Sequence, residues 1–112
     1  MEEKLVKKRV TSNYAGEVRR AIEPALALIG PWREAVALMT AALPRSGDTD
    51  RVEMTQRCAA IRREIHTARG ALVKRLAQVS AKAAGSSRVA DVEEAFNSIE
   101  AAVDDLDDRM GH

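Results

Sequence analysis

The chain has 112 residues, with 18 basic and 17 acidic side chains, and 46% of it is hydrophobic. Twenty of the hydrophobic residues are alanine, so the large apolar side chains suffice for one thin core and a single domain, residues 1–112. An alanine-rich, charge-rich chain with only three prolines is typical of long packed helices. A net charge of +1 excludes a strong overall field that would steer a polyanion to the molecule. Composition therefore predicts an all-α protein and does not identify its function.

The start of the chain and its cysteine content bear on location. Met1-Glu2-Glu3-Lys4 leads into no apolar segment of signal-peptide length, and no run approaches the roughly 18 apolar residues that cross a bilayer. Cys58 is the single cysteine, so no disulfide framework can form within the chain. We expect a cytoplasmic protein with no membrane association.

The N-terminal half predicts a basic lead over residues 1–12 and a first helix over residues 13–43. The cap-like cluster Thr11-Ser12-Asn13 separates the two, and apolar residues then recur at helical spacing as far as Leu43. Gly30-Pro31 falls inside that pattern, and a proline within a helix removes a backbone hydrogen bond. We expect a kink near residues 30–31.

A second helix is predicted over residues 50–84. Asp50 and Glu53 have the spacing of a capping box and follow a turn-rich segment. The apolar residues that follow recur at alternating intervals of four and three: Met54, Cys58, Ile61, Ile65, Ala68 and Leu72. The next apolar positions, from Leu76 to Ala83, are displaced by one residue, which we interpret as a stutter within the same helix.

A third helix is predicted over residues 87–109. Gly85 ends the preceding helix, and Ser86 with Ser87 supplies a new N-cap. Apolar residues then repeat at intervals of three and four: Val89, Val92, Phe96, Ile99, Val103, Leu106 and Met110. The predicted fold is an all-α, antiparallel three-helix bundle with long, uneven helices and coiled-coil-like packing.

Charge is distributed unevenly, and pairing between the second and third helices accounts for it. Residues 52–85 carry a net charge of +5 and residues 86–112 a net charge of −6. A short turn forces these helices into an antiparallel hairpin, and setting Ile65 opposite Leu106 aligns both apolar seams. The flanking pairs of opposite charge are then Arg62 with Asp107, Arg69 with Glu100, and Glu64 with Arg109. Such pairs specify the relative orientation of the two helices more than they stabilise the bundle.

Two features indicate a surface for a protein partner. Because the second helix is predicted to be longer than the third, an apolar groove stays open near its start, and a second copy of the chain, residues 1–12 or a foreign helix would close it. We favour a homodimer. The third helix ends in carboxylates that its dipole disfavours, which indicates either a solvated, frayed end or a contact for a basic partner. The predicted partner-binding residues are Leu38, Met39, Leu43, Val52, Met54, Asp104, Asp105 and Asp108.

The segment His66-Thr67-Ala68-Arg69-Gly70 has a candidate chemical role. A glycine inside a helix costs stability, and Gly70 beside an exposed histidine leaves space for a phosphoryl group that arginines would bind. The segment resembles the His-x-x-Lys-Gly core of histidine phosphotransfer domains, helical bundles that relay phosphoryl groups to response regulators. That resemblance implies His66 as phosphoacceptor beside Arg69 and Gly70, with Arg69 in the place of the usual lysine. An incidental surface histidine is the simpler interpretation.

Other chemistry has less support in the sequence. Seven basic residues from Arg57 to Lys82 on the second helix make nucleic-acid binding an alternative, but the near-neutral chain has few aromatic side chains to stack on bases. No cysteine or histidine pair has metal-ligand spacing, and no nucleophile elbow or phosphate-binding loop is present. We expect no metal, no cofactor and no enzymatic activity.

The sequence thus favours a small, non-enzymatic protein–protein interaction module: an adaptor, an inhibitor or an assembly factor. Its first alternative is a phosphorelay through His66, which acid-labile labelling of that residue by a phosphodonor kinase would reveal. Its second alternative is a nucleic-acid-binding accessory protein, which would hold mixed-sequence DNA above very low salt.

Overall fold

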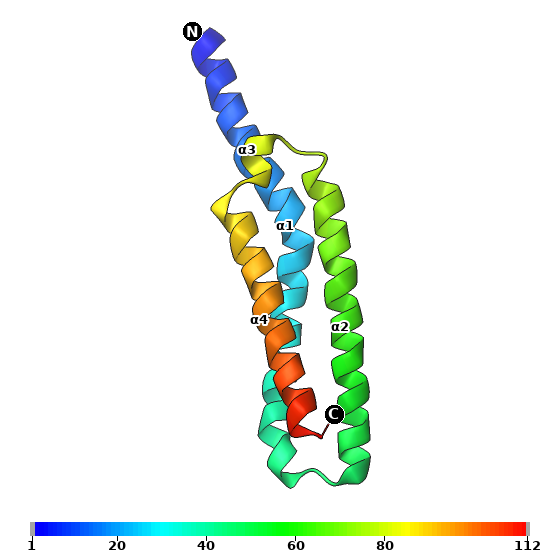
Figure 1. The fold of residues 1–112 in the computed structure, drawn as a ribbon. Coiled ribbons are helices and arrows are strands. Elements are labelled where there is room, and N and C mark those ends of the chain that lie inside the picture. The colour runs from blue at the N-terminus through cyan, green and yellow to red at the C-terminus, as the bar shows by residue number, and fades with distance from the viewer. Residues whose placement is uncertain (1, 112) are drawn as a thin grey trace.

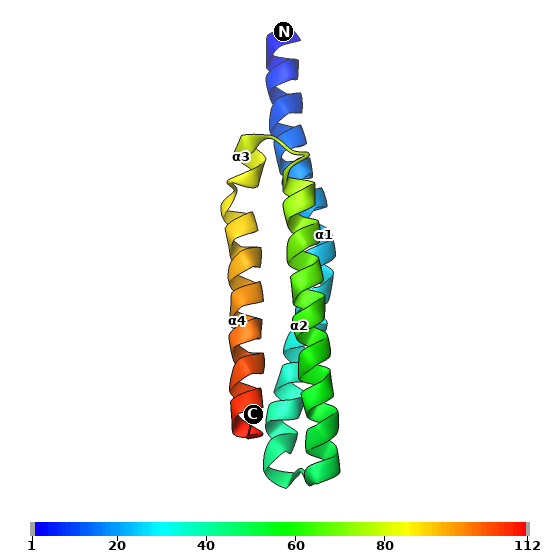
Figure 2. The same ribbon diagram turned by 45° about the vertical axis from the view of Figure 1, so that its right-hand side comes forward.

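The computed structural model describes the backbone of residues 2–111 and the side chains of residues 14–111. Three long helices lie side by side: α1 (Glu2–Ala42), α2 (Asp48–Leu76) and α4 (Ser87–Arg109). A turn of 3-10 helix, Leu43–Arg45, follows α1, and a short helix α3 (Ala81–Ala84) connects α2 to α4. α1 and α4 run in the same direction, α2 runs against both, and each long helix contacts the other two (Figure 1, Figure 2). The predicted all-α three-helix bundle is confirmed.

α1 is one helix where the sequence predicted a lead and a boundary near residue 13. Its bounds are Glu2–Ala42, so the cluster at residues 11–13 does not begin it, and Pro24 and Pro31 lie inside it without ending it. Each proline lacks an N–H, so α1 forgoes a backbone hydrogen bond at each, a loss that packing of its buried face has to offset. The predicted fold-back of residues 1–12 onto the groove lies outside the described side chains.

α2 begins at Asp48 rather than at residue 50. Its N-cap is Gly47, and Asp50, predicted as the cap itself, is the third residue of the helix. The Asp50 carboxylate accepts a hydrogen bond from the Gly47 N–H at 3.3 Å, which is one half of a capping box. Glycine has no side chain to supply the other half. The capping interaction predicted for Asp50 and Glu53 is therefore found three residues earlier, between Gly47 and Asp50.

α2 ends at Leu76 rather than at residue 84. Val79 lies in the connection, and Ala83 lies in α3, whose N-cap Ser80 accepts a hydrogen bond from the Ala83 N–H at 3.2 Å. The displaced apolar pattern therefore marks a break and not a stutter, because α3 redirects the chain and Ala83 is still fully buried. The third predicted helix is confirmed at both ends as α4, where Ser86 accepts a hydrogen bond from the Arg88 N–H at 3.2 Å.

The core is one cluster to which all four α-helices contribute. Phe96 of α4 is fully buried, and its ring meets Trp32 of α1 edge to face with the centroids 5.9 Å apart. Such an aromatic pair stabilises by about 0.5–1.5 kcal/mol beyond the area it buries. The other large side chains that are almost completely buried are Ile22, Ile61, Ile65, Val103, Leu106 and Cys58.

Two of the three predicted ion pairs between α2 and α4 are confirmed. Arg62 pairs with Asp107 and also with Asp104, whose Oδ1 lies 2.7 Å from its Nη2. Hydrogen bonding to Asp104 raises the pKa of the Arg62 guanidinium, and hydrogen bonding to Asp107 raises it further. Partial burial of Arg62 acts in the opposite direction. Arg69 pairs with Glu100 at 3.0 Å. The predicted antiparallel arrangement of α2 and α4 is therefore supported by its charges.

The third predicted ion pair, between Glu64 and Arg109, is wrong. Glu64 accepts a hydrogen bond from the Trp32 indole N–H at 3.3 Å, so its carboxylate faces α1. Arg109 instead pairs with Asp105, one turn earlier on its own helix, at 3.0 Å. α2 thus turns one charged face toward α4 and a different face toward α1.

Candidate interaction groove

The groove predicted near the start of α2 is closed by the chain itself. Met39, Leu43 and Met54 are buried in the core, so they are not open apolar surface. α2 has 29 residues, fewer than residues 50–84 would give, and the mismatch in length with α4 is smaller than predicted. The Sδ atom of Met110 also lies 3.9 Å from the Thr55 hydroxyl oxygen, so the end of α4 reaches over this region.

Leu38 and Val52 are the two members of that predicted apolar set that are exposed. A hollow at this end of the bundle is lined by Met39, Ala42, Arg45, Ser46, Asp50, Glu53, Met54 and Arg57. Most of these side chains are polar or charged. The apolar atoms that line the hollow come mainly from Met39, Ala42 and Met54, and charged side chains surround them.

Cys58 lies in the core behind this hollow and is fully buried. Burial raises the pKa of its thiol, the nearby Asp107 carboxylate raises it further, and Arg62 acts in the opposite direction. A thiol that stays protonated is a poor nucleophile. Cys58 is therefore a packing residue.

The acidic end of α4 is partly occupied by cations of its own chain. Asp104 pairs with Arg62, and Asp105 pairs with Arg109. Asp108 is exposed and makes no ion pair with the other side chains of residues 14–111. Of the three predicted acidic contacts, Asp104 joins α4 to α2, Asp105 pairs within α4, and Asp108 faces solvent.

His66 lies exposed on α2, and the groups predicted around it are engaged elsewhere. Arg69 donates hydrogen bonds to Glu100 and to Asn97 of α4, so a phosphoryl group would have to compete with a carboxylate already bound. A Cβ added at Gly70 would meet no atom within 4 Å. Gly70 is therefore not required by packing, and the space beside His66 is open.

The described part of the chain also bears on metal binding and on membrane association. Within residues 14–111, no group of three or more His, Cys, Asp or Glu side chains is placed to hold a metal ion. The segment Tyr14–Arg45 is long and apolar enough to cross a membrane by length and composition, which is weak evidence because core helices pass the same test. Only 28% of its most apolar window is buried, so α1 carries apolar surface that the bundle does not cover. The cytoplasmic location stays a prediction.

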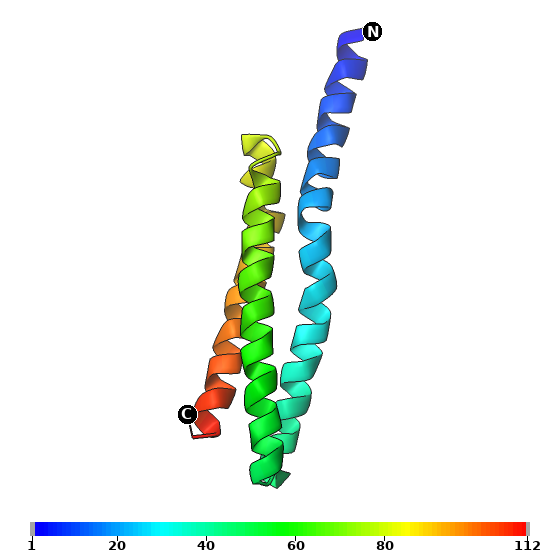
Figure 3. The same ribbon diagram turned by 90° about the vertical axis from the view of Figure 1, so that its right-hand side faces the viewer.

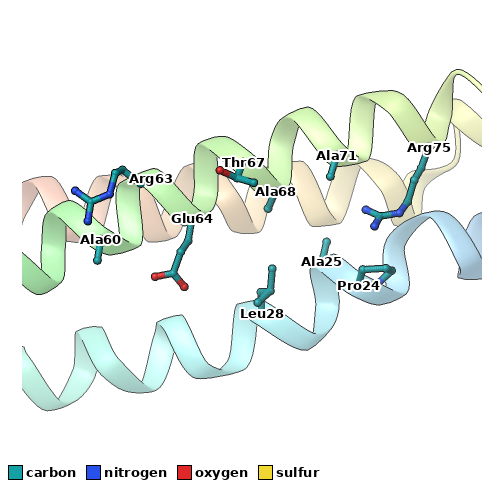
Figure 4. Close-up of a pocket in the computed structure, with 10 residues that line it drawn as sticks. All are labelled: Pro24, Ala25, Leu28, Ala60, Arg63, Glu64, Thr67, Ala68, Ala71 and Arg75. Atoms are coloured by element: carbon teal, nitrogen blue, oxygen red, sulfur yellow. The ribbon is translucent and has the colours of Figure 1, made fainter.

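A largely apolar cavity of about 400 Å³ lies between α1 and α2. Its lining residues come from these two helices alone: Pro24, Ala25, Leu28, Ala60, Arg63, Glu64, Thr67, Ala68, Ala71 and Arg75. Figure 4 shows Pro24, Ala25 and Leu28 projecting from α1 toward the small side chains of α2. α1 and α2 diverge from the hairpin at Leu43–Arg45 toward this cavity (Figure 3).

One face of α1 beside this cavity is apolar along half of the helix. Its residues recur at alternating intervals of four and three and form what we call the α1 stripe: Pro24, Leu28, Pro31, Ala35, Leu38 and Ala42. Leu28 is 39% exposed and Leu38 is 64% exposed, whereas the parallel series from Val18 to Leu43 is buried except for Val36, which is partly buried. The sequence interpretation missed the α1 stripe because it took the apolar residues of this helix as a single seam.

Charged side chains stand at intervals along the α2 side of the cavity. Arg63 and Arg75 line it near opposite ends, and neither makes an ion pair with another side chain of residues 14–111 (Figure 4). Glu64 lies between them and is held toward α1 by its hydrogen bond from Trp32. We call the cavity together with the α1 stripe the α1–α2 groove.

The α1–α2 groove is a largely apolar surface that the fold leaves open beside charged side chains. No family model, curated protein or solved structure matches this chain. The residues of the groove are therefore the basis on which a function can be proposed.

Proposed function

We propose that the chain is a non-enzymatic helix-binding module whose α1–α2 groove receives one amphipathic helix of another protein. The observation that carries the proposal is the α1 stripe, because a helix with a second apolar face is normally covered by another helix. The small side chains Ala60, Ala68 and Ala71 on α2 leave room for one. An added helix would complete a four-helix bundle, with apolar residues of the ligand at i, i+3, i+4 and i+7 facing the groove.

Burial of the exposed leucines gives a scale for this interaction. A fully buried leucine contributes about 1.5–3 kcal/mol, and Leu28 and Leu38 are 39% and 64% exposed. Covering them therefore contributes about 1 and about 1.5 kcal/mol, to which the exposed part of Pro31 and Ala42 adds less. Such sums suit a module that binds and releases its partner, as adaptors, inhibitors and assembly factors do.

The alternatives from the sequence receive less support. Phosphotransfer through His66 would need Arg69, which is bound to Glu100. Nucleic-acid binding through α2 loses Arg62 and Arg69 to α4. The homodimer rested on a groove of Leu38, Met39, Leu43, Val52 and Met54, of which Met39, Leu43 and Met54 are core residues and Leu38 and Val52 are exposed. We treat a second copy of the chain as a competing occupant of the α1–α2 groove.

Site-specific photo-cross-linking tests the proposal in the cells from which the chain comes. A photoreactive phenylalanine derivative replaces Leu28 in the groove, and the control carries it at Val73, which is 66% exposed on α2 and does not line the cavity. We expect adducts at position 28 that map to one helix of a partner, with cross-linked residues at helical spacing, and that are lost on Leu38→Glu. Equal adducts at positions 28 and 73, or adducts only between two copies of this chain, would contradict the proposal.

A further inference from the structure

The charge of α2 is only partly neutralised within the chain. α2 has seven basic and four acidic residues, a net charge of +3, and α4 pairs with Arg62 and Arg69 on the opposite side of α2 from the groove. Arg63 and Arg75 are left at the α1–α2 groove without a carboxylate partner among the described side chains. A guanidinium beside an apolar surface is a strong site for a carboxylate, because its planar donors bind both oxygens.

The position of these charges along α2 is specific. Arg63 and Arg75 are twelve residues apart, which is about 18 Å at the helical rise. Glu64 directly follows Arg63, and the Trp32 indole holds its carboxylate toward α1. A ligand therefore meets a positive and a negative charge side by side at the Arg63 end of the cavity, and a positive charge at the Arg75 end (Figure 4).

We propose that the occupant of the α1–α2 groove is an amphipathic helix with one acidic side chain near each end of its apolar face and none between them. This inference rests on the proposed function and specifies its ligand. Two positions eleven residues apart lie on nearly the same face of a helix and about 16 Å apart along its axis, so acidic residues at i and i+11 match Arg63 and Arg75. An acidic residue about one turn inward from the Arg63 end would meet Glu64, which directly follows Arg63.

A second copy of the chain fits this surface less well. In a two-fold dimer the same groove faces itself, so the arginine-bearing edges of both copies would approach each other. The outer face of α4, which is acidic, has no apolar stripe to fill a groove, because its apolar series is buried in its own bundle. A foreign helix with acidic ends meets both requirements.

Three synthetic helical peptides of about 21 residues test this inference with the full chain. All share one apolar face and one composition except that the first has glutamates at i and i+11, the second has both glutamates near the middle, and the third has lysines in place of glutamates. Fluorescence anisotropy measures affinity at low and at moderate salt. We expect the first peptide to bind about tenfold more tightly than either of the others, with a difference that shrinks as salt rises.

Variants of the chain test which of its side chains cause the difference in peptide affinity. Arg63→Glu with Arg75→Glu should weaken binding of the first peptide about tenfold, whereas Arg51→Glu with Lys74→Glu, the same charge change at exposed α2 positions outside the cavity, should weaken it less than about threefold. Glu64→Gln keeps an acceptor for Trp32 and removes the negative charge beside Arg63, so it should improve binding of the first peptide severalfold.

The outcomes separate this inference from the proposed function. If the three peptides bind equally, or if both double variants have the same effect, the charge pattern is wrong, although cross-links at Leu28 to a partner helix would still support a helix-binding module. If Leu38→Glu weakens none of the peptides and Leu28 forms no partner adduct, both proposals fail. If light scattering shows that the chain is a dimer and none of the three peptides binds it, the inference is also overturned.

Discussion

Arg62→Leu is expected to destabilise the bundle more than Arg69→Leu, although both remove one arginine that pairs with α4. The difference comes from the carboxylates left behind. The Asp107 side chain is 13% exposed, and its Oδ1 is buried with no hydrogen-bond partner, so Arg62 is its principal compensation. The Glu100 side chain is 37% exposed and water can replace Arg69.

The magnitudes follow from that contrast in burial. Loss of an exposed pair costs about 0.2–1 kcal/mol, which is the expected effect of Arg69→Leu. Leaving a largely buried carboxylate without its partner costs about 1–3 kcal/mol, and the exposed contact of Arg62 with Asp104 adds a smaller amount. Arg62→Leu should therefore lower the free energy of unfolding by about 1–2 kcal/mol more than Arg69→Leu.

Urea unfolding at neutral pH, followed by far-ultraviolet circular dichroism, measures both values, provided that the denaturant dependence stays constant across the variants. A third protein carries Arg62→Leu and Asp107→Leu together, and removal of the stranded carboxylate should recover most of the lost stability. Equal costs for the two single variants would refute the reasoning. So would a double variant no more stable than Arg62→Leu, because Asp107 would then be hydrated in the absence of Arg62.

Three further outcomes are expected. Because burial raises the native pKa of Cys58, the unfolded chain loses the thiol proton at a lower pH than the folded chain. The free energy of unfolding should therefore fall above about pH 8.5 by at most about 1.4 kcal/mol per pH unit. Cys58→Ala should remove that part of the pH dependence, and the same slope in both proteins would contradict the assignment. Gly70→Ala should raise the free energy of unfolding by about 0.5–1 kcal/mol in thermal denaturation, since the added methyl group meets open space on a helix, and a decrease would mean that the site is crowded. Phe96→Ala should cost about 3–5 kcal/mol and shift Trp32 emission to longer wavelength, whereas Val73→Ala, at an exposed position, should do neither.

The C-terminal half of the fold could be predicted from local signals. α4 has a serine cap at its start and an unbroken apolar repeat, and both signals act within one helix, so its bounds were predicted correctly. The pairs of Arg62 with Asp107 and of Arg69 with Glu100 followed from aligning two neighbouring seams. The connection, residues 77–86 with α3 inside it, is longer than the predicted turn, and α2 and α4 are antiparallel across it.

The candidate site could not be predicted in the same way, because it depends on contacts distant in sequence. Glu64 was assigned to Arg109, but its donor is Trp32 of α1, whose approach no periodicity in α2 reveals. The end of α2 at Leu76 decides how much of α2 is covered by α4, and the open groove moved accordingly from Met39 and Met54 to Leu28. Periodicity identifies which residues are apolar, and tertiary packing decides which of two adjacent apolar stripes is covered.

The shape of the bundle has a hydrodynamic consequence. Its extents are 69 × 21 × 15 Å and its radius of gyration is 18.6 Å, whereas a compact domain of this length has a radius of gyration of about 13 Å. A rod experiences more friction than a sphere of equal mass, so a single copy will elute from a sizing column at the volume of a heavier globular protein. Early elution is therefore the expected behaviour of the monomer, and only a measurement that reports mass independently of shape distinguishes one copy from two.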